Sequence, residues 1–537
     1  MTPKTEHSDT IGIARSAGSV GVAVFASRIL GLIREQVLAA LFGAGYFIDA
    51  YVVAFRIPNL LRDLFAEGAL SAAFVAVFSD YDQKRGPEMT WRLANYVMVA
   101  LSIIVGVIVL AGMIFAGDLV ALMAPDFSRV PGKTSLTTTM TVIMSPFLLF
   151  VSLAAVVMGV LNTKGRFFIP AMSSAFFNLG SIVSGVMLAF VFPYFGRPAI
   201  IGMAVGTLIG GLLQFLVQLP ALFGAGFRFR PAVSFREEGI LRIGRLMIPA
   251  IIGLSATQIN IFVNTIFASS CEQGSVSWLS YAFRLMQFPI GVFGVAIAVA
   301  TLPVVSRHAS NKDLVQLKNT VVSSLVMAFI LTIPASCGLI ILAKPIIRLI
   351  FEHGRFTGYD TIRTAEALSF YSIGLFAYSS VKIIVPVFYA LDDTKYPVIA
   401  SFMAVVTNIL IVSLTLDLFR HKAIAFSTSV TMIMSLIFLS TALYRKLEGY
   451  ALGYLLKSFV KIGLASLIMS ATAYYSQKWL YGLFAEGFWA EILSVLGAIT
   501  FAAGCYFGLL CGLGLKEWRL LVEKIRQKAT AVFGAET

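Results

Sequence analysis

The fold is decided most directly by residues 48–79, whose sequence is IDAYVVAFRIPNLLRDLFAEGALSAAFVAVFS. The run is long enough to cross a bilayer, because a membrane-spanning helix needs about 20 mostly apolar residues. It nevertheless contains five charged side chains. Charged residues within a span are energetically costly and occur where they face water or one another. This stretch therefore predicts a membrane helix whose charged residues are candidates for function.

The composition extends this prediction to the whole chain. Hydrophobic residues make up 58% of the 537 residues and charged residues only 13%, whereas soluble domains carry roughly 25% charged residues. Such a chain cannot cover a water-facing surface, which excludes a soluble enzyme. The apolar runs are unbroken, unlike the alternating strands of a transmembrane barrel. We expect an all-α polytopic membrane protein.

Apolar runs bounded by charges and turn residues predict about fourteen spans. They lie near 12–43, 48–79, 93–117, 136–161, 168–192, 198–222, 246–270, 276–305, 319–343, 364–390, 396–416, 423–443, 458–477 and 488–514. An even number places both termini on one side. With that side in the cytoplasm, the cytoplasmic segments hold about 25 Lys and Arg and the opposite segments about 10, as the positive-inside rule requires.

A repeat divides these spans into two sets. Ala54-Phe55-Arg56 recurs as Ala282-Phe283-Arg284, shifted by 228 residues. The shift crosses six spans, so both copies point the same way, as in transporters built from parallel repeats with a substrate site between the halves. We expect an N-terminal lobe at 1–223, a C-terminal lobe at 224–450, two extra helices at 451–515 and a basic amphipathic tail at 516–537.

Ionisable side chains are concentrated in the first two spans. These hold eight of them: Arg28, Arg34, Glu35, Asp49, Arg56, Arg62, Asp63 and Glu67. The other span interiors hold only Arg284, Glu366, Lys382 and Glu491. A charge at mid-bilayer costs about 2.5–3.5 kcal/mol on insertion scales, so such residues face water or each other and are candidates for function.

Three of the arginines lie near mid-depth and suggest an anion site. At 1.5 Å per residue, Arg28 and Arg62 lie about 20 Å from their helix ends, and Arg284 repeats the pattern in the second lobe. Guanidinium groups bind phosphate oxygens in pairs and stay charged. We therefore expect a cavity for an anionic, phosphorylated amphiphile. The alternative is an internal ion-pair ladder, in which Asp49, Arg56 and Asp63 neutralise one another on one helix face.

Other motifs predict little. The cysteines and histidines lack metal-ligand spacing, and Gly132-Lys133-Thr134 lacks the upstream glycine of a phosphate-binding loop. We expect no metal, no cofactor and no nucleic acid. Asp392-Asp393 is interpreted as a solvated loop. The basic tail is interpreted as an interfacial helix on anionic lipid.

The charged first hairpin also carries a family resemblance. Residues 27–35 (SRILGLIRE), 49–62 (DAYVVAFRIPNLLR) and 65–69 (FAEGA) resemble the bacterial lipid II flippases of the MurJ (MviN) family. These belong to the multidrug/oligosaccharidyl-lipid/polysaccharide (MOP) exporter superfamily. Supporting stretches are 274–278 (GSVSW), 281–286 (YAFRLM) and 351–357 (FEHGRFT).

The resemblance implies a fourteen-helix, two-lobe transporter that moves lipid II from the inner to the outer leaflet by alternating access. It implies a multi-pass protein of the bacterial cytoplasmic membrane and no enzyme activity. It implies roles for seven residues: substrate binding by Arg28, Arg34, Arg62, Arg284 and Lys382, and gating or coupling by Asp49 and Glu67. We add Asn59 to the expected substrate-binding residues and Arg56 to the expected gating residues. Some members bind sodium through acidic residues of spans seven and eleven. Here those spans offer Gln258, Asn260, Asn264 and Asn408 but no carboxylate, which argues against a sodium site.

Alternatives remain at this point. An exporter of another lipid-linked oligosaccharide or of drugs would have the same fold. A membrane glycosyltransferase would need paired carboxylates, for which Asp392-Asp393 is the candidate. A scaffold would have no use for arginines at mid-membrane. The expected partners are lipid II and membrane lipids, and proteins of cell-wall synthesis are left open.

Overall fold

The computed structural model describes residues 4–63, 68–483, 487–520 and 522–523, and these contain helices and no strand. By their contacts they form two compact units, 1–277 and 278–537. The first unit holds α1 (Lys4–Phe42), α2 (Tyr46–Arg62), α3 (Ala69–Lys84), α4 (Gly86–Ile114), α5 (Ala116–Met123), α6 (Lys133–Met144), α7 (Phe147–Thr163), α8 (Phe168–Val191), α9 (Ile200–Leu216), α10 (Leu219–Phe223) and α11 (Glu238–Ser269).

The second unit holds the remaining helices, the first of which begins just before the boundary. They are α12 (Ser275–Pro289), α13 (Val295–Ser310), α14 (Leu314–Ile341), α15 (Ala343–Phe351), α16 (Gly358–Ile373), α17 (Leu375–Ala390), α18 (Lys395–Phe419), α19 (His421–Lys446), α20 (Leu452–Leu483) and α21 (Phe488–Gly512). A π-helical turn, Ile290–Gly294, joins α12 to α13 after Pro289.

The helix bounds repeat with the shift found in the sequence. Adding 228 to the bounds of α7 gives 375–391, and α17 spans Leu375–Ala390. The same shift carries α4 onto α14, α5 onto α15 and α8 onto α18, each to within one residue at both ends. The repeat is therefore confirmed at the level of helix order and length. The lobe boundary at residue 223 stays a prediction.

Among the described residues, eleven helices or continuous helix pairs are long and apolar enough to span a membrane. The number is twelve if α16 and α17, bent by 43° at Gly374, count as one span. The expected number of fourteen is not confirmed. The expected all-α polytopic fold is confirmed.

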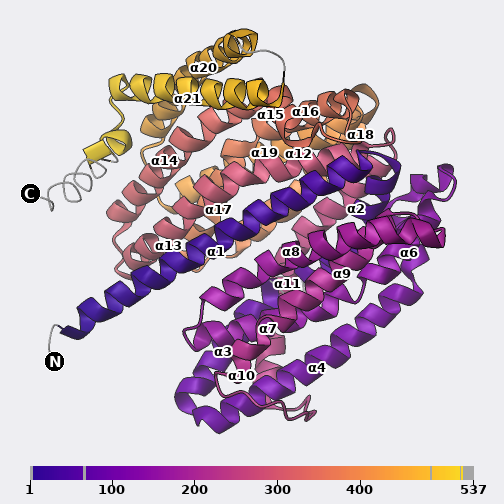
Figure 1. Ribbon diagram of the computed structural model, residues 1–537. Coiled ribbons are helices and arrows are strands. Elements are labelled where there is room, and N and C mark those ends of the chain that lie inside the picture. Colours follow the sequence, from indigo (N-terminus) through magenta and orange to yellow (C-terminus); the bar gives the residue numbers. More distant parts are fainter. Residues whose placement is uncertain (1–3, 64–67, 484–486, 521, 524–537) are drawn as a thin grey trace, which may run out of the picture. The chain divides into compact units, whose positions relative to one another are not determined.

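Close helix packing in the first unit depends on glycines spaced by four. Gly202, Gly206 and Gly210 of α9 face α8, which lies beside it in Figure 1. A Cβ built on Gly206 would lie 2.4 Å from the Cα of Gly185, closer than any real Cβ contact. Small residues at this spacing allow membrane helices to approach until their backbones touch.

Each unit has its own apolar core. In the first unit, α3, α4 and α7 bury side chains such as Phe74, Leu93 and Val160, and Phe227 from the segment after α10 joins them. In the second unit, α14, α17 and α19 pack with α20 and α21, which run side by side in Figure 1.

Candidate functional site

Asp49, one of the predicted site residues, is buried and accepts several hydrogen bonds. Its side chain lies in the first turn of α2 and is only 1% exposed. Oδ1 accepts hydrogen bonds from the backbone N–H of Ser277 at 3.0 Å and from Ser277 Oγ at 2.6 Å. Oδ2 accepts one from the backbone N–H of Gly274 at 2.8 Å. Asp49 thus caps the N-terminus of α12, where free N–H groups and the helix dipole favour a carboxylate.

Lys133 completes this contact and was not among the predicted site residues. Its Nζ lies 2.9 Å from Asp49 Oδ2, and Lys133 is 2% exposed. Gly132 adopts a left-handed φ of 75°, and Lys133 is the first residue of α6. The ammonium also lies 4.1 Å from the ring centre of Phe127. Lys133, which lies between the predicted spans 93–117 and 136–161, is therefore a buried counterion.

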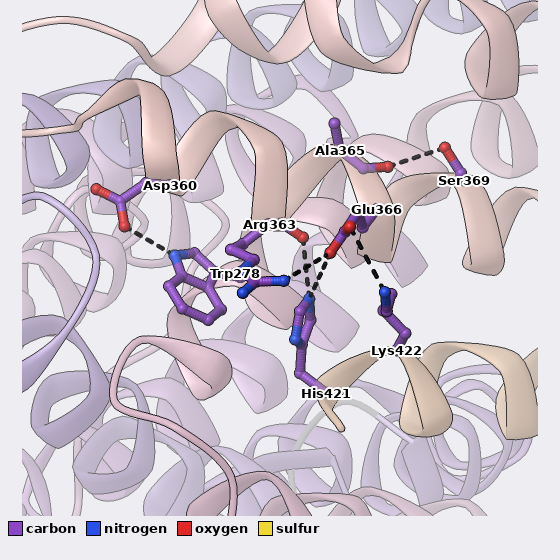
Figure 2. Close-up of polar contacts among 8 residues, drawn as sticks. All are labelled: Trp278, Asp360, Arg363, Ala365, Glu366, Ser369, His421 and Lys422. Carbon is purple, nitrogen blue, oxygen red and sulfur yellow. Dashed lines mark hydrogen bonds and ion pairs between the residues drawn. The ribbon is translucent and has the colours of Figure 1, made fainter. Parts of the chain in front are cut away.

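The second unit repeats this arrangement with different side chains. Lys133, at the start of α6, bonds to Asp49 in α2; Asp360, near the start of α16, accepts a hydrogen bond from Trp278 Nε1 in α12 at 2.9 Å (Figure 2). Asp360 also forms a capping box with Thr357, which fixes the beginning of α16. The first turn of α6 therefore contacts the beginning of α2 in the first unit, and the first turn of α16 contacts the beginning of α12 in the second.

Figure 2 also shows how the charge of Glu366 is compensated. Its carboxylate lies 3.3 Å from Arg363 Nη1, 3.5 Å from Lys422 Nζ and 3.9 Å from His421 Nε2. The imidazole of His421 is fully buried, and its Nε2 is 3.1 Å from the carbonyl oxygen of Arg363. This cluster joins α16 to α19, so Glu366 has a structural ion-pair role.

Two of the predicted arginines lie in local ion pairs. Arg34 is 5% exposed, with Nη2 3.0 Å from Glu35 and its guanidinium carbon 5.2 Å from the ring centre of Phe177. Arg62 donates to Asp63 Oδ1 through Nε at 3.2 Å and Nη2 at 2.8 Å.

Arg56 bonds to a different helix. Its Nη1 donates to Thr265 Oγ1 of α11. Of the residues in the expected ladder, Asp49 therefore bonds to Lys133 and α12, Asp63 bonds to Arg62, and Arg56 bonds to Thr265.

The remaining predicted residues differ in exposure. Arg28 in α1, Arg284 in α12 and Lys382 in α17 are exposed. Asn59 is half-buried, and its Oδ1 has no hydrogen-bond partner among the described atoms. Glu67 lies outside the described residues. Arg28, Arg34, Asn59 and Arg62 belong to the first unit and Arg284 and Lys382 to the second, so the convergence of the arginines stays a prediction.

Comparison with known proteins identifies the family. The family model described as lipid II flippase MurJ matches residues 38–494. A probable lipid II flippase MurJ of Buchnera aphidicola subsp. Acyrthosiphon pisum is 35% identical over 428 residues, 80% of this chain and 83% of that protein.

Solved structures agree. The structure of a lipid II flippase MurJ in an inward closed conformation matches with a TM-score of 0.75 and 28% identity, over 90% of this chain and 97% of that one. An inward-facing multidrug resistance MATE family transporter of the MOP superfamily matches with a TM-score of 0.67 at 14% identity, over 79% of this chain and 94% of that one, a likeness of fold alone. The chain belongs to the lipid II flippase MurJ family.

Proposed function

We propose that this protein moves lipid II from the inner to the outer leaflet of a bacterial cytoplasmic membrane. The observation that carries the proposal is the family match over residues 38–494, which includes Arg62 and Arg284. The protein acts as a transporter and not as an enzyme. Both termini lie in the cytoplasm, in keeping with the excess of basic residues in the cytoplasmic segments.

In this proposal, the arginines of both units bind the pyrophosphate of lipid II. Arg28 and Arg284 are exposed on their helices, and charged side chains within spans mark the pathways of substrates and ions. A planar guanidinium group can bind two oxygens of one phosphate through two parallel hydrogen bonds. Asn59 and Lys382 add polar contacts, and Lys382 is also exposed.

Asp49 has a different role, because a carboxylate repels the anionic headgroup. Its three hydrogen bonds from Gly274 and Ser277 hold the beginning of α12 against α2. We assign it to gating: the contact forms in one state of the alternating-access cycle and breaks in the other. Arg56, which bonds to Thr265, and Glu67 belong to the same group.

Depletion of the protein in growing cells tests the function. Lipid II should accumulate in the inner leaflet, and an inducible copy should restore its appearance outside. Unchanged exposure of lipid II after complete depletion would contradict the proposal. Accumulation of a different lipid-linked oligosaccharide would favour the exporter alternative. Proteins of cell-wall synthesis are proposed as partners that co-purification would identify.

A further inference from the structure

The segment between α10 and α11 combines exposed arginines with exposed aromatic rings. Residues 224–236 read GAGFRFRPAVSFR and contain no acidic residue. Arg228, Arg230 and Arg236 are exposed. Phe229 is 56% exposed, Val233 55% and Phe235 45%. We call residues 224–236 the linker.

The linker backbone is fixed although it has no regular structure. The Asn95 side chain of α4 donates through Nδ2 to the carbonyl oxygen of Arg228 at 3.1 Å and accepts from the N–H of Arg230 at 2.7 Å. Phe227 is 3% exposed and its ring centre lies 5.9 Å from that of Trp91. With Phe227 buried and the backbone held at both sides of Phe229, the Phe229 ring is held outward.

These contacts also fix the depth of the linker along α4. Asn95 lies nine residues after Gly86, about 14 Å along the helix. From Leu93 to Ile114, α4 has no charged residue, so its hydrocarbon-facing part begins near Leu93. The linker at Phe229 therefore lies beside the first turn of that part, at the level where a membrane passes from headgroups to hydrocarbon.

Two of the acidic side chains near the linker are paired with basic residues outside it. Glu238 pairs with Arg85 at 2.6 Å, and Asp80 pairs with Lys84 and with Arg242, each at 2.6 Å. These hydrogen bonds from Lys84 and Arg242 hold the pKa of Asp80 below its usual value. Of the carboxylates close to the beginning of α11, Glu238 and Asp80 are thus already bound to other cations, whereas Glu237 directly follows the linker.

We propose that the linker is a membrane-docking surface for the anionic lipid of the cytoplasmic leaflet: Phe229, Val233 and Phe235 enter the interface while Arg228, Arg230 and Arg236 bind headgroup phosphates. Each basic residue near an anionic surface contributes about five-fold to binding, and phenylalanine is among the side chains that amphipathic segments bury at the headgroup boundary. The proposal rests on the cytoplasmic orientation given under the proposed function, but it does not depend on the substrate.

Nitroxide labels measure the immersion directly. The four native cysteines, Cys271, Cys337, Cys505 and Cys511, are first replaced in the full-length protein, and one label is placed at Phe229→Cys. The control label is at Gln83→Cys, an exposed position near the end of α3 in the same unit. Liposomes contain either phosphatidylcholine alone or phosphatidylethanolamine with phosphatidylglycerol, and accessibility to oxygen is compared with that to a water-soluble nickel complex.

In the anionic liposomes, the label at position 229 should favour oxygen over nickel several-fold relative to the label at position 83. Replacing Arg228, Arg230 and Arg236 together by glutamine should reverse most of this difference, while the nearby Asn95 contacts keep the backbone in place. A label at 229 as accessible to nickel as the one at 83 would overturn the docking surface. Equal immersion in both lipids, unchanged by the glutamines, would overturn its assignment to anionic lipid. Lipid II transport is not measured, so either failure leaves the proposed function separately testable.

Discussion

Lys133 Nζ lies 2.9 Å from Asp49 Oδ2, and the two residues are 2% and 1% exposed, so α6 holds a buried ion pair with the residue that caps α12. Removing one partner of a buried pair leaves an uncompensated charge and costs about 3–5 kcal/mol. We expect Lys133→Met to lower the thermal stability of the purified protein and to abolish complementation of a flippase-depleted strain.

A double-mutant cycle separates this pair from general damage. Asp49→Asn combined with Lys133→Met removes both charges. The double variant should therefore lose clearly less stability than the sum of the losses of the two single variants. Lys133→Arg keeps the charge and should retain part of the activity. Additive losses, with no coupling between the two positions, would show that the ion pair contributes nothing.

Gly206 offers a test of the packing between α8 and α9. A Cβ there would lie 2.4 Å from Gly185 Cα, so Gly206→Leu must push the helices apart, and overpacking costs about 1–3 kcal/mol or more. The matched control is Gly106→Leu in α4, where nothing lies within 4 Å of a built Cβ. Thermal unfolding in detergent should show a midpoint lowered by several degrees for Gly206→Leu and almost unchanged for Gly106→Leu. Equal midpoints would contradict the close packing.

The orientation is tested by labelling single cysteines in a cysteine-free protein. Gly132 and Lys344 are exposed and follow helices predicted to run outward, whereas Lys312 is exposed between α13 and α14 on the predicted cytoplasmic side. In intact cells, an impermeant maleimide should label positions 132 and 344 and leave 312 unlabelled until the membrane is opened. Labelling of 312 alone would reverse the predicted topology.

The fold was largely predictable because it depends on local sequence patterns. Apolar runs locate membrane helices, and the shift of 228 between Arg56 and Arg284 predicted the repeat that the helix bounds confirm. The break inside the run 364–390 was not predicted: the run is divided at Gly374, where the backbone N–H bonds to Ser429 Oγ of α19. Such a break depends on a neighbour that is distant in sequence.

The site was predictable only in part for the same reason. A carboxylate in a span, such as Asp49, is recognisable from sequence because placing its charge in lipid costs free energy. Lys133 stands in a polar stretch, where a solvated loop lysine and a buried helix-start lysine have the same sequence pattern. Its partner is 84 residues away, and no local rule connects them. Gly132 before it adopts a left-handed φ in the structure, a conformation that glycine favours in many kinds of turn, so it does not by itself indicate a helix start.

Transport should depend on membrane potential. Lipid II carries negative charge on its pyrophosphate and peptide, and each charge that crosses 100 mV gains about 2.3 kcal/mol. A negative interior therefore drives the headgroup outward without ATP, provided that co-moving cations do not compensate its charge. We expect lipid II exposure to stop when an ionophore collapses the potential at constant ATP. Continued exposure under those conditions would contradict this energy source.

The last prediction concerns the arginines of the proposed cavity. If Arg28, Arg62 and Arg284 bind pyrophosphate, alanine at any of them should abolish complementation while the protein still reaches the membrane in normal amounts. Lysine should impair transport less than alanine, because it keeps the charge but loses the paired geometry of the guanidinium. Membrane levels by immunoblot and lipid II exposure are measured together.

The contact of Arg62 with Asp63 at 2.8 Å supplies the decisive control. If Arg62 only neutralises Asp63, Arg62→Ala should be poorly folded and Asp63→Asn should partly rescue it. If Arg62 binds substrate, the Arg62→Ala protein should accumulate normally, and Asp63→Asn should not restore transport. Asp49→Asn and Glu67→Gln should slow turnover more than binding, since acids act in gating. Full complementation by the alanine variants of Arg28, Arg62 and Arg284 would leave the cationic cavity without support, because an anion cannot be held in a membrane interior once its counter-charges are gone.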